Sequence, residues 1–445
     1  MEPTKSCELL MSFLLNNNCI SFVSHNLQTK KILLSLYNQI STASEYIAKE
    51  KSSNPNFYNL KIKRILSESD IPKPTTFNDK TLIEIVDEHI KTFSYYLLTY
   101  TFELLNRQIT IYFVLEKSGV DENLDLEPDI RKFNKYVDNM LLWLSIIDKQ
   151  SKTKCGNNIS IFVYMTSLKK ELPQVDNVTL DKIHVNTAFT YSCPSSLAEI
   201  VIYREEEWFK VFLHESMHNF NLDFSSMSIS YCHDKMMELF HIKMNTALYE
   251  AYAEFWAKTM NILIFSYHSM KEHNKNINDE KQKFKSFIRY VDFLMNYERM
   301  HCYFQMVKVL KYNKLTYKEL YTDMQKTNGY NEKTNVFAYY VITLILISNY
   351  PEFLKWCYNN NSNTNLMQFA HSDVNQVSFC QYIESQYKNK KLLKNVKCTE
   401  KLLQKIILEK TNIMNQRKMT KKQKNKLLQL NYALTNLRLS LCEIQ

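Results

Sequence analysis

The sequence contains very little glycine. Only Gly119, Gly156 and Gly329 occur in 445 residues, where average usage would give roughly thirty. Because these three lie far apart, the glycine-rich loops that bind nucleotides and the glycine-flanked serine of many hydrolases are absent. We therefore expect no nucleotide cofactor. Proline is also scarce, with eight residues, and so few helix-breaking residues in a long chain favour a mostly helical fold.

The sequence also lacks long apolar runs and closely spaced cysteines. Its longest apolar stretch, residues 337–347, has eleven residues and is too short to span a bilayer. The N-terminus has neither the basic start nor the small-residue cleavage site of a signal peptide. None of the ten cysteines forms a CxxC pair, and they are too sparse for a disulfide scaffold. We therefore expect a soluble, intracellular protein of the cytoplasm whose cysteines are reduced.

The composition is that of a globular protein. Apolar residues make up 45% of the chain, so a sizeable core can be buried. The abundance of Lys, Asn, Ile, Tyr and Phe resembles the composition of proteins from large DNA viruses. For a viral protein, the expected location is the host cytoplasm or the virion.

The pattern along the chain predicts three regions. Residues 1–150 carry apolar residues at helical spacing, most clearly over 80–115, and are predicted to be a helical N-terminal region. Residues 151–350 contain three β-prone runs in a helical background, which predict a small sheet. With a helical C-terminal region at 351–445, the fold class is α+β and mostly α-helical. The candidate strands are residues 159–165, 187–192 and 199–203.

The positive charge is concentrated in residues 388–426. This segment carries fourteen Lys or Arg against two acidic residues, a balance of +12, while the whole chain has +10. Apolar residues recur within it at helical spacing, as in a basic amphipathic helix. Such a helix can bind nucleic acid, an anionic membrane or a protein partner. It can equally pack its apolar face on the protein and expose its lysines to solvent.

A helical stretch after residue 205 contains an HExxH motif at residues 214–218. Two histidines four residues apart lie on one face of a helix, so both imidazoles can bind the same Zn²⁺ ion. The Glu215 carboxylate can then take the proton of a water that the metal has made acidic. The motif therefore predicts zinc as the cofactor, His214 and His218 as its ligands, and Glu215 as the catalytic base.

A catalytic zinc site needs a third protein ligand. Glu250 and Glu254 lie four residues apart on a second helical stretch, where neighbouring alanines allow close approach of another helix. We predict that Glu250 binds the zinc. We predict also that Glu254 accepts a hydrogen bond from His214 or His218, which fixes the tautomer of that imidazole. The alternative third ligands are Glu238, His233 and His241.

The motif at 214–218 together with Glu250 and Glu254 resembles the active site of zincin metallopeptidases of the gluzincin type. The resemblance covers about residues 157–260 and implies a zincin-like core within 151–350, with a small sheet over the HExxH helix. It also implies zinc-dependent hydrolysis of peptide bonds in a peptide or protein substrate.

Two further roles follow from the resemblance. The edge strand of the sheet pairs with the substrate in this family, which implies that residues 199–203 are that edge. Hydrolysis of an amide also needs a donor to the oxyanion, and zincins often take it from a later Tyr, His or Arg. The candidates here are Tyr203, Tyr231, His233, Tyr330, Tyr339 and Tyr340.

A different function is also compatible with the sequence. The chain could be a non-catalytic, zinc-containing structural or interaction protein that binds nucleic acid, membrane or a partner through residues 388–426. Its affinity for nucleic acid should then fall steeply with salt. Deleting residues 386–445 should abolish that function, whereas Glu215→Gln should not.

Overall fold

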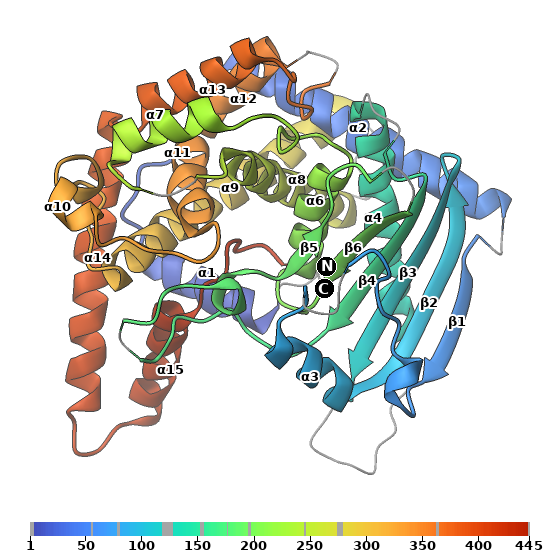
Figure 1. Cartoon of the computed structure of the whole chain (residues 1–445), viewed down its shortest axis with the longest axis horizontal. Coiled ribbons are helices and arrows are strands. Elements are labelled where there is room, and N and C mark those ends of the chain that lie inside the picture. Colours follow the sequence, from blue (N-terminus) through green and yellow to red (C-terminus); the bar gives the residue numbers. More distant parts are fainter. Residues whose placement is uncertain are drawn as a thin grey trace.

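The computed structural model describes residues 4–54, 57–77, 81–117, 128–151, 155–175, 177–194, 197–243, 246–273, 279–361 and 365–443. These residues form a mixed α+β fold in which helices predominate and a six-stranded sheet lies along one side (Figure 1). The predicted fold class, α+β and mostly helical, is confirmed at this level.

The sheet has the strand order β1-β2-β3-β4-β6-β5. The pairs β1/β2, β2/β3 and β5/β6 are antiparallel, whereas β3/β4 and β4/β6 are parallel. The three predicted strands correspond to β4, β5 and β6. The strands are β1 (Asn59–Arg64), β2 (Ser94–Leu104), β3 (Arg107–Glu116), β4 (Asn158–Met165), β5 (Ala188–Thr190) and β6 (Leu197–Ile202).

The predicted substrate-pairing edge is wrong. Residues 199–203 fall mostly in β6, which lies between β4 and β5 and therefore has no open edge. The edge strand on this side is the three-residue β5. The sequence pattern predicted this strand but not its place at the edge, because strand order depends on the whole sheet.

The prediction that residues 1–150 are helical is wrong for β1, β2 and β3. Helical spacing of apolar residues is real over α3 (Glu84–Phe93) but ends there. Beyond it, alternate side chains such as Leu98 and Tyr100 are buried, which is the period of a strand. The two strands β2 and β3 meet in a two-residue turn, where Leu105 and Asn106 both have positive φ.

The two faces of the sheet pack against different elements. On one face, Ile161 and Ile200 are cross-strand neighbours and join the main hydrophobic core. On the other face, Phe162 and Val201 are neighbours and pack in a separate cluster with Val86 of α3. Because successive residues of a strand point to opposite faces, the sheet is covered by helices on both sides.

The remaining helices form the larger part of the molecule around α8 (Leu248–His273), which is buried along most of its length. Helix α6 (Trp208–Asn219) packs against α8 and against β5 and β6, so it lies between the sheet and the helical body (Figure 1). The other α-helices are α1 (Lys5–Asn16), α2 (Leu27–Ser53), α4 (Ile130–Gln150), α5 (Lys182–Val185), α7 (Ser230–Phe240), α9 (Glu280–Tyr312), α10 (Met324–Thr327), α11 (Thr343–Ser348), α12 (Tyr350–Asn360), α13 (Asp373–Gln386), α14 (Lys390–Met414) and α15 (Lys421–Thr435). Two 3-10 turns, Glu68–Asp70 and Glu319–Tyr321, and a π-helical segment, Phe337–Ile342, complete the set.

The basic segment 388–426 is a helical hairpin formed by α14 and the first part of α15. The apolar face of α14 packs against α9, where Leu392, Val396 and Leu403 are buried. Its lysines lie toward solvent, and the hairpin extends away from the body of the molecule (Figure 1). The predicted amphipathic helix is confirmed, and its apolar face belongs to the protein core.

The chain after α15 returns to the interior. Leu437, Leu439 and Leu441 are buried, and the Leu439 backbone N–H donates to the carboxylate of Glu207 at the start of α6 (3.2 Å). Deleting residues 386–445 would therefore remove part of the core, so such a deletion cannot separate a binding function from loss of folding.

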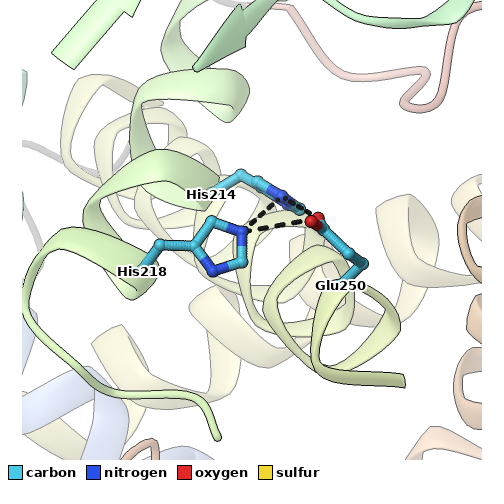
Figure 2. Close-up of side chains that lie close together, drawn as sticks. All are labelled: His214, His218 and Glu250. Atoms are coloured by element: carbon cyan, nitrogen blue, oxygen red, sulfur yellow. Dashed lines mark hydrogen bonds and ion pairs between the residues drawn. The ribbon is translucent and has the colours of Figure 1, made fainter. Parts of the chain in front are cut away.

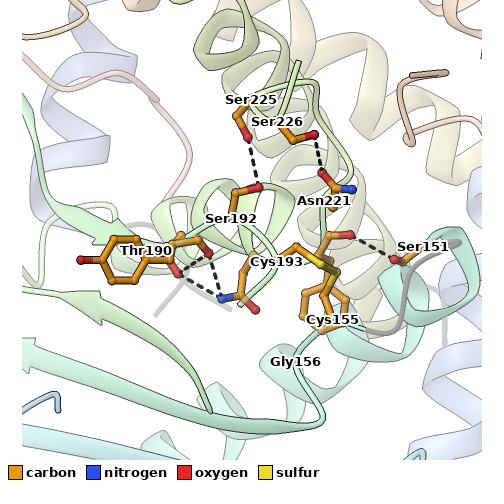
Figure 3. Close-up of a disulfide and its surroundings, with 12 residues drawn as sticks. Ser151, Cys155, Gly156, Thr190, Ser192, Cys193, Asn221, Ser225 and Ser226 are labelled. Carbon is orange, nitrogen blue, oxygen red and sulfur yellow. Dashed lines mark hydrogen bonds between the residues drawn. A yellow bond between two sulfur atoms is a disulfide. The ribbon is translucent and has the colours of Figure 1, made fainter. Parts of the chain in front are cut away.

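The expectation that all cysteines are reduced is wrong for one pair. Cys155 and Cys193 form a disulfide that joins the segment before β4 to the loop after β5 (Figure 3). The other eight cysteines have free thiols. The sequence concealed the pair because its members are 38 residues apart, and only the sheet brings them together.

Among the described residues, no single helix is long and apolar enough to cross a membrane. One bent pair, Phe337–Ser348 with Tyr350–Asn360, passes the length and composition test when both parts are taken together, with an angle of 90° between them. The expected location of the protein stays a prediction.

Candidate metal centre

Helix α6 carries the HExxH motif, and all twelve of its residues are buried. The helix is apolar on several sides, so it is enclosed by protein rather than lying at the surface. His214 and His218 are one turn apart and extend toward α8 (Figure 2). Their Nε2 atoms lie 3.1 Å from each other.

Helix α8 supplies the third member of the cluster, Glu250. Its Oε2 atom lies 3.1 Å from Nε2 of His214 and 3.4 Å from Nε2 of His218 (Figure 2). These three side chains form a group that could hold a metal ion, with one donor atom each. The sequence pattern therefore selected three residues that the fold brings together, although they come from helices separated by 28 residues of chain.

Glu254 lies behind His214, one turn along α8 from Glu250. One of its carboxylate oxygens is 3.1 Å from Nδ1 of His214. Both oxygens accept hydrogen bonds from Nζ of Lys210, each at 3.0 Å. Lys210 is itself on α6, one turn before His214, so the same helix provides the ligand candidate and the cation that holds the carboxylate facing it.

Asp223 is the equivalent partner of His218, and the sequence pattern did not predict it. Nδ1 of His218 pairs with Oδ2 of Asp223, and the other oxygen accepts from the backbone N–H of Ser225 (2.8 Å). Asp223 lies in the loop after α6, where the chain has left the helix and helical spacing no longer predicts which side chains meet. A carboxylate shortly after the motif was the only signal in the sequence.

The charges of the site favour ionised carboxylates beside the imidazoles. Burial acts to raise the pKa of Glu250, but His218 and His214 outweigh it and hold that pKa well below its usual range. Burial likewise opposes ionisation of Glu254, whose pKa is lowered chiefly by Lys210 and His214. The two imidazoles thus lie among three carboxylates, those of Glu250, Glu254 and Asp223, a set of groups that suits a bound cation.

Glu215 differs from the other carboxylates of the site. It is buried, yet it lines the cavity beside His218, and among the described residues no hydrogen-bonding group reaches its oxygens. Burial raises its pKa, with Glu250 adding to the effect and the two histidines opposing it. A carboxylate that faces a cavity without a protein partner is free to bind water.

The cavity has a volume of about 290 Å³ and lies between α6, α8 and the edge strand β5. Tyr203 and Tyr339 contribute to its walls, and β5 forms one side. The pairing of Thr187 with Tyr203 alternates with that of Phe189 with Val201. The backbone N–H and C=O groups of the intervening Ala188 and Thr190 therefore point away from β6, toward the open edge.

The structure separates the candidate oxyanion donors. The Tyr339 hydroxyl lies at the metal cluster and donates to Oε2 of Glu250 at 3.0 Å. Tyr340 donates instead to the backbone of Leu437, and Tyr330 donates to Glu332. Tyr231 is 41% exposed on α7 and does not line the cavity, whereas Tyr203 lines it from the side of the sheet.

The alternative ligands of the sequence analysis lie elsewhere. The Glu238 side chain is 67% exposed on α7 and pairs with Lys235 at 3.2 Å. Within the described parts of the chain, neither Glu238 nor His233 or His241 belongs to a group that could hold a metal ion.

Comparisons with known proteins found no matching family model, no similar curated protein and no similar solved structure. The interpretation of this site therefore depends on its own residues and their geometry.

Proposed function

We propose that the chain is a zinc-dependent peptide hydrolase with a zincin-like core of the gluzincin type. The supporting observation is the spacing of the three donor atoms, which are 3.1, 3.1 and 3.4 Å apart. At zinc–ligand distances of about 2.0–2.1 Å, two ligands of a tetrahedral site are about 3.3–3.4 Å apart. Two imidazoles and one carboxylate also form a donor set that zinc prefers in catalytic sites.

Zinc held by His214, His218 and Glu250 would supply Lewis-acid chemistry that makes water a nucleophile at neutral pH. Glu215 takes the proton of the attacking water and passes it to the nitrogen of the leaving amine. Its raised pKa suits this role because a stronger base removes the proton more readily. The Tyr339 hydroxyl is positioned to donate to the oxygen that becomes negative.

The edge strand β5 favours a peptide as the substrate. An extended peptide can pair with the outward-facing backbone groups of Ala188 and Thr190, as an additional antiparallel strand. Because β5 lines the cavity that contains Glu215, such a peptide would lie with its backbone beside the metal cluster.

The test is Glu215→Gln in the purified full-length protein. The variant should keep about one zinc per chain and lose peptide hydrolysis by ~10²–10⁴-fold, since only the base is removed. Zinc content is measured by elemental analysis, and turnover is measured with a mixture of unstructured peptides analysed by mass spectrometry. Glu238→Gln, which changes an exposed glutamate on α7, is the matched control and should leave both unchanged. Wild-type turnover in Glu215→Gln would refute the assignment.

A second candidate function is binding of an anionic partner by the α14–α15 hairpin. A groove of about 1160 Å³ lies between these helices and includes Lys401, Lys405, Lys422 and Lys426 in its walls. Leu408, which is 64% exposed, lies in the same groove. Clustered lysines beside an apolar side chain favour a polyanion such as nucleic acid.

This second function predicts salt-dependent binding that point variants can test without removing core residues. Lys405→Glu together with Lys422→Glu should weaken binding of a single-stranded oligonucleotide. Lys30→Glu with Lys31→Glu, on the exposed side of α2, is the matched control. If both double variants bind the oligonucleotide with equal affinity, the groove between α14 and α15 is not the binding site.

A further inference from the structure

Cys232 on α7 and Cys380 on α13 form a second close pair of cysteines. Their sulfur atoms are 2.9 Å apart, although the residues are 148 positions apart in the chain. Both side chains are completely buried. Among the described residues, neither sulfur has another hydrogen-bond partner, so each thiol contacts only the other as a hydrogen-bonding group.

We propose that Cys232 and Cys380 are a site of disulfide formation, and that the mature protein carries this bond in addition to Cys155–Cys193. A disulfide has an S–S length of about 2.05 Å, so the two sulfurs need to approach by only about 0.9 Å. The structure already contains one disulfide, and a second would form under the same oxidising conditions. This proposal replaces the expectation of a reduced cytoplasmic protein and does not depend on the proposed hydrolase activity.

The bond would form by exchange with an oxidised thiol such as glutathione disulfide. The Cys232 thiolate attacks one sulfur of glutathione disulfide, which gives a mixed disulfide and releases one glutathione thiolate. The Cys380 thiolate then attacks the Cys232 sulfur and displaces the second glutathione thiolate. Two protein thiols are oxidised, one glutathione disulfide is reduced to two thiols, and the two protons from the cysteines pass to the released thiolates.

The reaction belongs to folding rather than to the finished structure. The hydrogen bond to Cys232, and then burial, hold the pKa of the Cys380 thiol far above its usual range. Only the thiolate attacks a disulfide, and a raised pKa leaves little thiolate. Exchange with glutathione disulfide is therefore too slow once α13 has packed on α7, so the bond forms before that step. The same burial then protects the bond from reducing agents.

The crosslink would stabilise the part of the fold that holds Asp223, the partner of His218. The segment before and within α13 makes hydrogen bonds to the loop after α6. The Phe369 N–H donates to the Leu222 carbonyl (2.8 Å), and the Gln376 side chain donates to the Ser228 carbonyl (2.9 Å). His371 contacts the carbonyl of Asp223 itself. A disulfide between α7 and α13 would therefore fix covalently the segment that makes these hydrogen bonds.

The observed disulfide is also next to a residue that contacts the loop after α6. Cys193 follows Ser192 in the loop after β5, and the hydroxyl groups of Ser192 and Ser225 are hydrogen-bonded at 3.2 Å (Figure 3). The two crosslinks would thus both lie next to segments that contact the loop after α6, which carries Asp223.

The experiment is disulfide mapping of the full chain after folding in a buffer of reduced and oxidised glutathione. The protein is denatured in excess N-ethylmaleimide, digested without reduction and analysed by mass spectrometry. A crosslinked peptide containing Cys232 and Cys380 is the expected result. Maleimide on both residues would overturn the proposal.

Two alanine variants separate the bond from the loss of a buried thiol. Cys232→Ala should leave Cys380 labelled by maleimide and lower the unfolding temperature by several degrees more than Cys357→Ala. Cys357 is a completely buried free thiol on α12 and is the matched control. Equal unfolding temperatures for the two variants would contradict a covalent role. The mapping of the wild-type chain decides the proposal even if Cys232→Ala does not fold.

Discussion

Lys210 and Glu254 form an ion pair inside the protein, with Nζ of the lysine 3.0 Å from each carboxylate oxygen. The pair lies directly behind His214, whose Nδ1 is 3.1 Å from the same carboxylate. Lys258 continues the charged row, 3.6 Å from Glu254 and 3.1 Å from Glu298. The row keeps the Glu254 carboxylate ionised and aimed at the imidazole. Nε2 of His214 then carries the lone pair that a metal requires.

Glu254→Gln should lower the affinity for zinc by about 10–100-fold, because the amide supports the His214 tautomer less well than a carboxylate. It should also destabilise the fold, since Lys210 would be left as a buried cation without its anion, at a cost of roughly 3–5 kcal/mol. Zinc affinity is measured by competition with a chelator and stability by urea unfolding. Adding Lys210→Met should restore stability without restoring zinc affinity. Unaltered zinc binding in Glu254→Gln would show that the carboxylate does not act on His214.

Asp223 should affect zinc through His218 in a graded way. Asp223→Ala removes both the acceptor and the charge and should weaken zinc binding by about 10–100-fold. Asp223→Asn keeps an acceptor oxygen and should fall between this variant and wild type. Ser225→Ala removes a neighbour that donates to the other oxygen of Asp223 (2.7 Å) and serves as a control for the loop. Wild-type zinc affinity in both the Asn and the Ala variant would show that Asp223 does not act on zinc through His218.

Tyr339→Phe should lower kcat for peptide hydrolysis by about 10²–10³-fold while zinc content and KM stay close to wild type. The hydroxyl group is the only part removed, and it lies next to the ligand candidate Glu250. Tyr340→Phe is the matched control, because its hydroxyl donates to Leu437 in the core. That control should lower thermal stability and leave kcat unchanged. If Tyr339→Phe instead raises KM and leaves kcat unchanged, the hydroxyl acts in substrate binding.

Glu207 should make the fold sensitive to acid. Burial acts to raise its pKa, but Lys170 foremost, with Lys210 and Arg438, lowers it from 4.5 to about 2. The stabilisation is therefore present above pH 4.5 and is lost as the pH falls toward 2. Its size at neutral pH is on the order of 3 kcal/mol.

Urea unfolding between pH 5 and pH 2.5 measures this effect. Glu207→Gln should be less stable than wild type at pH 7 and should lose less stability over that interval. Glu88→Gln, on the exposed side of α3, should follow the wild-type curve. If the free energy of unfolding falls equally with pH in wild type and Glu207→Gln, Glu207 is not the cause of the acid sensitivity.

The sequence predicted those features of the candidate site that depend only on the geometry of a single helix. His214 and His218 had to share a face of α6, and Glu250 and Glu254 a face of α8, because a helix repeats every 3.6 residues. Which of several glutamates would approach α6 was a weaker inference, and it depended on the alanines near Glu250. Asp223 and Lys210 were not predicted, since their roles depend on where a loop returns and on which side chain fills the space behind an imidazole.

The strands show the same division. Residues 159–165 were recognisable because their apolar run is bounded by polar residues, whereas β2 follows α3 without a break and continues its apolar content. The edge position of β5 was not in the sequence at all, because strand order is a property of the whole sheet. Cys155 with Cys193, and Cys232 with Cys380, likewise meet only after distant elements pack.

By itself, the sequence determined the helical character of the chain, the amphipathic nature of residues 388–426 and the spacing of the HExxH residues on one helical face. These properties depend on contacts within a few residues, so composition and period are enough to predict them. Only the tertiary structure decided that Glu250 approaches His214 and His218, that β5 is the open edge, and which charged groups support the site. Such contacts join residues far apart in the chain. They form together when the apolar faces of α6, α8 and the sheet are buried against one another.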